Sequence, residues 1–160
     1  MLWIRSVLLA TLLVSLAWKG EKLVRSEVEW LQILGEERYQ VMRKKKTEHG
    51  FTGKYVSTNP PGLYSCAACT LPLFLSEDKY DVGSGWPSFL KPVASKNVYY
   101  LEDWNLPFKR YEVLCSRCDS HLGHVFHDGP PPKYFRYTIN SLALLYLKKG
   151  ESHASKERIQ

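Results

Sequence analysis

The feature that most constrains this chain is a pair of CxxC segments. Cys66-Ala-Ala-Cys69 and Cys115-Ser-Arg-Cys118 together hold all four cysteines of the 160 residues. Each short turn aims two sulfurs at one point, and two such turns that meet give four thiolates around one ion, the usual arrangement of structural zinc. Four sulfurs leave no position for water, so we expect a Zn²⁺ that stabilises the fold without doing chemistry. Two disulfides are the alternative in an exported chain.

Two histidines, His121 and His124, follow the second pair closely. They are too near Cys118 for a zinc finger with two cysteines and two histidines, in which the gap is far longer. Because four sulfurs already fill the coordination sphere, we expect both histidines to belong to a neighbouring polar site. Extra metal ligands and ordinary polar surface are the alternatives.

The first twenty residues predict a signal peptide or an N-terminal membrane anchor. Arg5 is the only charge in residues 1–17, and the apolar run of about a dozen residues is short for a membrane-spanning helix. Ser15-Leu-Ala17 offers a cleavage site after Ala17, while an uncleaved anchor and a buried N-terminal helix are the alternatives. We therefore expect export to a periplasmic or secretory space, with membrane contact only through this segment if it is retained.

A helical segment is predicted after residue 25. Ser26-Glu-Val-Glu29 has the pattern of a capping box, Gly35 is typical of a helix end, and a second short helix is predicted over Glu36–Lys44. The run Lys44-Lys-Lys46 is read as a solvated helix end rather than a nucleic-acid site, and the net charge of +6 requires no anionic partner. We expect no nucleic-acid partner.

From Phe51 onward the sequence consists of short β-type runs separated by Gly and Pro. Many short strands without intervening helices predict a mainly β fold, a small antiparallel β-barrel of two sheets with short N-terminal helices. The domain is expected over residues 26–147, followed by a polar tail over 148–160. The expected strands are Gly53–Ser57, Leu63–Ser65, Leu73–Leu75, Val98–Leu101, Tyr111–Leu114, His124–Phe126, Phe135–Ile139 and Leu142–Leu147.

A series of short segments between Ser26 and Leu147 resembles the type B methionine sulfoxide reductase family, which reduces the R epimer of methionine sulfoxide. The order and spacing of the segments, with two CxxC pairs between them, carry the resemblance. The segments are Tyr39-Gln-Val41, Thr47-Glu48, Phe51-Thr-Gly53, Gly85-Trp-Pro-Ser-Phe89, His121-Leu-Gly-His-Val-Phe126, Asp128-Gly-Pro130 and Arg136-Tyr-Thr-Ile-Asn-Ser141. The family fold is a small β-barrel of two antiparallel sheets, often with a zinc opposite the active site.

The resemblance also implies roles for individual side chains. In the family, a thiolate attacks the sulfoxide sulfur, and the resulting sulfenic acid is resolved by a second thiol or an external thiol reductant. The apolar wall for the S-methyl group is assigned to Trp86, with Phe126 beside it, and Arg136 lowers the pKa of the nucleophile. His121, His124 and Asn140 match the polar donors near the sulfoxide oxygen.

The chain departs from the family at two positions. Thr138 occupies the nucleophile position, and Ser84 occupies the position of the resolving cysteine. A threonine hydroxyl is a far poorer nucleophile than a thiolate, and it has no counterpart of the sulfenic acid that a thiol can rescue. Ser84 alone is tolerable, because an external thiol resolves a sulfenic acid.

Three functional hypotheses follow. The chain is a working methionine-R-sulfoxide reductase, a pseudoenzyme that binds oxidised methionine in proteins or peptides, or a non-catalytic zinc-stapled interaction domain. Retention of Trp86, His121, His124, Arg136 and Asn140 favours the second over the third, although Trp86 and Arg136 also suit barrel packing. We expect thiol-dependent catalysis to be impaired because of Thr138.

Overall fold

The computed structural model describes residues 16–57 and 60–151. The predicted leader up to residue 15 and the predicted tail from residue 152 lie outside these residues. No helix in the described part of the chain is long and apolar enough to cross a membrane. Residues 16–18 lie against the fold, because the buried Asn97 side chain accepts from the Trp18 N–H at 2.6 Å and donates to the Leu16 carbonyl at 2.7 Å.

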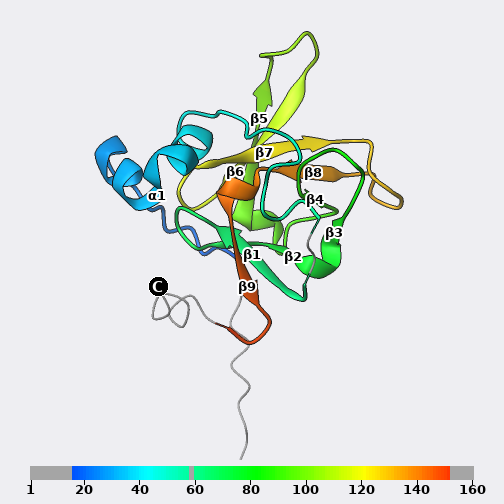
Figure 1. Ribbon diagram of the computed structural model, residues 1–160, viewed down its shortest axis with the longest axis horizontal. Coiled ribbons are helices and arrows are strands. Elements are labelled where there is room, and N and C mark those ends of the chain that lie inside the picture. The colour runs from blue at the N-terminus through cyan, green and yellow to red at the C-terminus, as the bar shows by residue number, and fades with distance from the viewer. Residues whose placement is uncertain (1–15, 58–59, 152–160) are drawn as a thin grey trace, which may run out of the picture.

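The helical segment is α1 (Glu27–Met42), which packs against the 3₁₀ turn η3 (Ser141–Ala143) and strand β7 (His121–Phe126) (Figure 1). The capping box predicted at Ser26 is present: its hydroxyl accepts from the Glu29 N–H, and the Glu29 carboxylate accepts from the Ser26 N–H. Gly35 interrupts the helix with φ 69° and ψ 166°. The two predicted helices are therefore the two segments of α1, and the second ends at Met42 rather than at Lys44.

Two antiparallel sheets make up the rest of the fold, which confirms the predicted fold class (Figure 1). The smaller sheet has the order β2-β1-β9, and the larger one has the order β3-β4-β8-β7-β6-β5. The bounds of the remaining strands are β1 Gly62–Cys66, β2 Pro72–Leu75, β3 Lys79–Tyr80, β4 Ser88–Phe89, β5 Val98–Asp103, β6 Arg110–Cys115, β8 Arg136–Ile139 and β9 Leu144–Lys148; the 3₁₀ turns η1 and η2 cover Ser76–Asp78 and Ser95–Asn97.

The strand predicted over Gly53–Ser57 is wrong. This segment forms turns, in which the Tyr55 N–H donates to the Ser141 hydroxyl and the Val56 N–H donates to the Gly53 carbonyl. Tyr55 is buried as part of this turn, so its apolar character reflects packing rather than sheet pairing. The other seven expected strands are present to within a few residues, and β9 reaches Lys148, one residue into the predicted tail.

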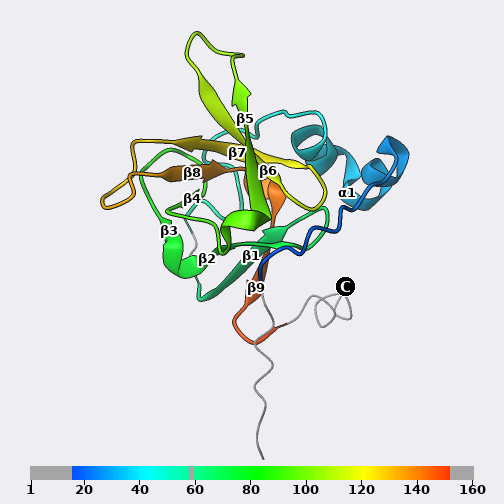
Figure 2. The ribbon, with the colours of Figure 1, turned by 180° about the vertical axis from the view of Figure 1, so that it is seen from behind.

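Aromatic rings from both sheets form the core. Phe74 of β2 stacks on Phe89 of β4 with ring centroids 4.4 Å apart, and Tyr64 of β1 meets the same Phe89 ring edge-on at 5.3 Å. Phe74 also contacts Tyr137 of β8, with centroids 5.9 Å apart. These contacts fix the small sheet against the part of the large sheet that contains β4 and β8. The β5–β6 hairpin, at the far edge of the large sheet, projects beyond the rest of the fold (Figures 1 and 2).

Candidate functional site

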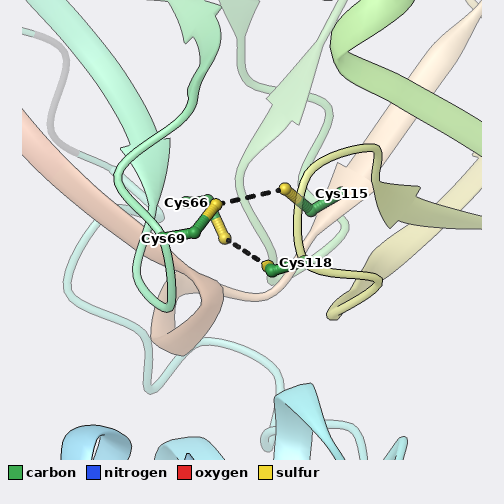
Figure 3. A group of neighbouring side chains, drawn as sticks. All are labelled: Cys66, Cys69, Cys115 and Cys118. Carbon is green, nitrogen blue, oxygen red and sulfur yellow. Dashed lines mark hydrogen bonds between the residues drawn. The ribbon is translucent and has the colours of Figure 1, made fainter. Parts of the chain in front are cut away.

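The four cysteines meet at one buried point between the two sheets (Figure 3). The Cys66 and Cys118 sulfurs are 3.7 Å apart, the Cys69 and Cys115 sulfurs are 3.5 Å apart, and all four lie within 4.8 Å of one another. Sulfurs placed about 2.3 Å from a tetrahedral ion lie about 3.8 Å from each other. The residues therefore fit the predicted Zn²⁺, and they are free thiols rather than the two disulfides of the alternative.

The two CxxC turns have the same local geometry. In the first, the Thr70 N–H donates to the Cys66 carbonyl at 2.8 Å, and in the second the Asp119 N–H donates to the Cys115 carbonyl at 2.9 Å. Thr70 and Asp119 both have positive φ, 63° and 60°. Each turn thus folds back directly after its second cysteine, which points both sulfurs inward. With four sulfurs as ligands, the bound zinc is structural.

A separate, small pocket of about 120 Å³ opens over the large sheet. It contains none of the four cysteines, and its floor includes β7 and β8. Its lining residues are Thr47, Trp86, Arg110, Gly123, His124, Phe126, Thr138 and Asn140. Five residues that sequence reasoning assigned to the sulfoxide site, Trp86, His124, Phe126, Thr138 and Asn140, are thus brought together.

Thr138 lies in the lining of this pocket because of the strand pairing. It is the direct partner of His124 on β7 and of Ser88 on β4. The β7 strand approaches this closely because Gly123 has no side chain: a Cβ there would overlap the Thr138 carbonyl oxygen. Residue 138 is therefore held beside the imidazole that the resemblance places near the sulfoxide oxygen.

Arg136 binds the Thr138 side chain directly. Its Nη1 donates to Thr138 Oγ1 at 2.7 Å, while its Nε and Nη2 donate to the two Asp128 carboxylate oxygens, both at 2.8 Å. The guanidinium also lies 4.5 Å from the centre of the Phe126 ring. The hydrogen bonds to Asp128 raise the pKa of Arg136, so a fixed positive charge stands at the side-chain oxygen of Thr138.

Trp86 forms the half-buried aromatic wall of the pocket. Its indole N–H donates to the Glu48 carbonyl at 3.1 Å. The Glu48 carboxylate in turn accepts from the N–H groups of Ser141 and Leu142, at 2.6 and 2.9 Å. The ring is thus tied to the loop that follows β8, and its orientation is fixed by the backbone of the site.

Asn140 lines the pocket, but its amide group is bonded to the surrounding backbone. Its Oδ1 accepts from the Glu48 N–H at 3.1 Å, and its Nδ2 donates to the Leu122 carbonyl at 3.0 Å. The side chain is 3% exposed. In this structure Asn140 therefore holds the pocket walls together in addition to bordering the space where the resemblance expects a polar donor.

Each histidine is oriented by a buried carboxylate. The His124 Nε2 is 2.8 Å from Asp103 Oδ2, and Arg110 binds the same oxygen at 2.7 Å. Burial opposes ionisation of Asp103, but hydrogen bonds from the Asn105 N–H and His124, with the Arg110 charge, lower its pKa to about 2. Burial lowers the pKa of His124 despite the Asp103 hydrogen bond. His124 is therefore neutral and donates its Nε2–H to the ionised carboxylate of Asp103.

His121 is buried and is not part of the pocket lining. Its Nδ1 is 2.7 Å from Glu112 Oε1, Lys45 binds the other carboxylate oxygen at 2.9 Å, and its ring is 5.5 Å from the ring of His124. Although burial opposes it, the hydrogen bonds from His121 and Lys45 lower the pKa of Glu112. Both histidines thus lie beside carboxylates in a polar site, as the sequence predicts, and neither belongs to the four-cysteine cluster.

Ser84, at the position of the resolving cysteine, is not part of the pocket lining. Its hydroxyl is 3.5 Å from that of Ser88, the cross-strand partner of Thr138.

Sequence reasoning missed Asp103, Arg110, Glu112 and Lys45. Arg110 and Glu112 alternate with apolar residues in β6, and this period of two is the signal that would have placed them on one face of the strand.

Comparison with known proteins agrees with this arrangement. A family model described as the SelR domain matches residues 34–148. The peptide methionine sulfoxide reductase MsrB of Azotobacter vinelandii is 49% identical over 131 residues, which cover 82% of this chain and 98% of that protein. The protein of the same name from Methanosarcina mazei is 46% identical over 136 residues, covering 85% and 97%, and that of Pseudomonas fluorescens is 48% identical over 124 residues, covering 78% and 95%.

The two antiparallel sheets, the four-cysteine zinc site and the Trp86–His124 pocket define a small zinc-containing β protein of the sulfoxide reductase type. The chain belongs to the peptide methionine sulfoxide reductase MsrB family, with a SelR domain.

Proposed function

We propose that this chain binds methionine-R-sulfoxide in proteins and peptides at the Trp86–His124 pocket but does not reduce it with thiols. Family membership supports the substrate, because the relatives carry the name peptide methionine sulfoxide reductase. The observation that carries the loss of turnover is Thr138, whose hydroxyl stands in the pocket where the resemblance expects a thiolate. A hydroxyl cannot take up the sulfoxide oxygen and be regenerated by a thiol.

The cysteines do not replace the missing nucleophile in this proposal. All four are buried in the metal cluster, with exposed fractions of 0–5%, and none lines the pocket. Release of one cysteine for redox chemistry would remove a ligand from the zinc, and this would destabilise the fold because zinc binding is coupled to folding. No cysteine of this chain therefore remains to supply a thiol at the pocket.

Binding, by contrast, does not need the sulfur. The wall for the S-methyl group is the Trp86 ring, held through its bond to the Glu48 carbonyl. A donor for the sulfoxide oxygen is supplied by Thr138 itself, because its hydroxyl accepts from Arg136 and keeps its own O–H free to donate. These groups favour a ligand with one apolar arm and one polar oxygen on the same centre.

The test is a pair of measurements on the intact, zinc-loaded chain. Calorimetry with N-acetyl-methionine-R-sulfoxide amide is expected to show binding, with weaker binding of the S epimer. A reductase assay with dithiothreitol and the same compound is expected to show turnover no faster than the background without protein. Absence of binding would favour the non-catalytic interaction domain, and clear turnover would favour the working reductase.

We further propose that residues 1–20 direct the chain out of the cytosol. The apolar run after Arg5 and the small residues Ser15 and Ala17 support this proposal. A reporter fused to residues 1–20 is expected to reach the periplasmic or secretory space. A wholly cytosolic reporter would contradict export.

A further inference from the structure

The β5–β6 hairpin carries an exposed apolar surface that the proposed pocket does not use. Residues 104–109 connect Asp103 to Arg110, the last paired residues of the two strands. Trp104, Leu106 and Phe108 in this loop are 65%, 41% and 56% exposed, and we call these three residues the hairpin tip. Three large apolar side chains within five residues, on a projecting element, are costly in water and typical of a binding surface (Figures 1 and 2).

The base of the hairpin is part of the pocket. Arg110 lines the pocket, and Asp103 binds His124, which also lines it. A strand advances about 3.3 Å per residue, so the apex of the loop lies within about 10 Å of these two residues. A polypeptide that places one side chain in the pocket and runs along the hairpin brings residues about three positions away to the hairpin tip.

The pocket is so small that a bound polypeptide must make its other contacts outside it. Sites for drug-sized ligands usually have volumes of about 300–1,000 Å³, whereas this pocket has about 120 Å³. It accommodates one side chain, and the polypeptide on both sides of that side chain must lie outside. Contacts beyond the oxidised methionine are thus made on the rim, to which the hairpin belongs.

Charge argues for an apolar polypeptide as the occupant. The cations at the hairpin are already paired: Lys109 binds Glu102 at 3.0 Å, and Arg110 binds Asp103 at 2.7 Å. Lys109 also lies over the Trp104 ring, 5.7 Å from its centre. Nucleic acids and anionic lipid surfaces are bound through cations that contact phosphate, and paired cations serve this poorly. Apolar side chains match the three tip residues without any charge requirement.

We propose that the hairpin tip binds apolar side chains that flank methionine sulfoxide in an extended polypeptide. This proposal rests on the proposed function, since it gives the pocket a preference among oxidised sequences. Burial of about 60 Å² of apolar surface at the tip corresponds to about a tenfold gain in affinity. Peptides with apolar flanks are thus expected to bind about tenfold more tightly than peptides with polar flanks.

The test uses three ligands, and phosphatidylcholine vesicles as an apolar surface without peptide, with the full, zinc-loaded chain. Two are peptides of equal length and charge with a central methionine-R-sulfoxide, one flanked by Leu and Val and the other by Ser and Gly. The third is N-acetyl-methionine-R-sulfoxide amide, which reaches the pocket alone. The test variant is Trp104→Ser/Phe108→Ser, and the matched control is Val24→Ser/Val28→Ser, which changes one exposed apolar residue before α1 and one in its first turn. Zinc content and thermal unfolding establish that both variants are folded.

The unaltered chain and the control are expected to prefer the apolar-flanked peptide by about tenfold, and the tip variant is expected to lose this preference while it binds the amide normally. Equal affinity of the unaltered chain for the two peptides, with the amide bound, would overturn the tip proposal and leave the proposed function standing. The same holds if the tip variant keeps the preference, or if only phosphatidylcholine vesicles, and no peptide, distinguish the variant from the control. Failure of the folded chain to bind the amide would overturn both.

Discussion

Asp103 shows how a residue outside the short segments that carry the family resemblance supports the site. Its carboxylate orients His124 and binds Arg110, and it is 8% exposed. We expect Asp103→Asn to destabilise the chain by about 2 kcal/mol at pH 7, because the hydrogen bonds to a buried charge are weakened. Urea denaturation of the variant and the unaltered chain measures this difference.

The pH dependence of that difference is a second prediction. The pKa of Asp103 is about 2 in the folded state, below its ordinary value of 3.8. A lowered carboxyl pKa contributes stability above the unfolded value and loses it as the pH falls through the folded value. The gap between Asp103→Asn and the unaltered chain should therefore narrow as the pH falls from about 4 towards 2, measured at equal zinc content. A constant gap across this range would contradict the assigned pKa.

At the residue scale, the sequence predicts which side chains gather at the pocket better than it predicts their positions and hydrogen bonds. The resemblance selects Trp86, His124 and Thr138, and the structure places all three in the lining of one pocket although they lie far apart in the chain. It does not predict that His121 is absent from the lining or that the Asn140 amide is bonded to the backbone of Glu48 and Leu122. Those outcomes depend on strand register and loop packing, which no local pattern specifies.

Among the elements, α1 contains a strict backbone requirement. Gly35 has φ 69° and ψ 166°, a region that essentially only glycine occupies. A Cβ at this position would have free space around it, so the cost of a substitution comes from the backbone alone. Gly35→Ala is expected to lower the free energy of unfolding by about 1–3 kcal/mol.

The neighbouring substitution Glu36→Ala is the matched control, because it changes an exposed residue of the same helix. Chemical denaturation should show a change within about 0.5 kcal/mol for this control. A Gly35→Ala variant as stable as the control would contradict the non-helical backbone conformation of residue 35.

The elements also differ in how well the sequence predicts them. Capping at Ser26 and the break at Gly35 are local chemistry, and both are present. The two-residue strands β3 and β4 were not predicted, because two residues are too few for any periodicity. The segment 53–57 has apolar residues of β type, yet its backbone bonds go to Ser141 and to its own turn.

For the whole molecule, the zinc site is a second link between the sheets, in addition to the aromatic core. Cys66 and Cys69 come from β1 and the turn after it, in the small sheet, while Cys115 and Cys118 come from β6 and the turn after it, in the large sheet. We expect Cys115→Ser to lose zinc and to lower the free energy of unfolding by about 4 kcal/mol or more, because metal binding and folding are coupled.

Elemental analysis and denaturation of purified protein check this prediction. Ala67→Ser, which alters a residue between two ligands and keeps all four thiols, is expected to retain one zinc and near-normal stability. An unaltered chain with under about a tenth of an equivalent of zinc would contradict the structural role of the ion.

The most direct test of the central claim is the reductase activity of Thr138→Cys. Residue 138 lies between His124 and Ser88 in the sheet, and Arg136 is placed 2.7 Å from its side-chain oxygen, where it would favour a thiolate. In an assay with a methionine-R-sulfoxide peptide and dithiothreitol, we expect no turnover by the unaltered chain and measurable turnover by Thr138→Cys, even with Ser84 unchanged. Robust turnover by the unaltered chain, or a folded and zinc-loaded Thr138→Cys variant without activity, would contradict the account.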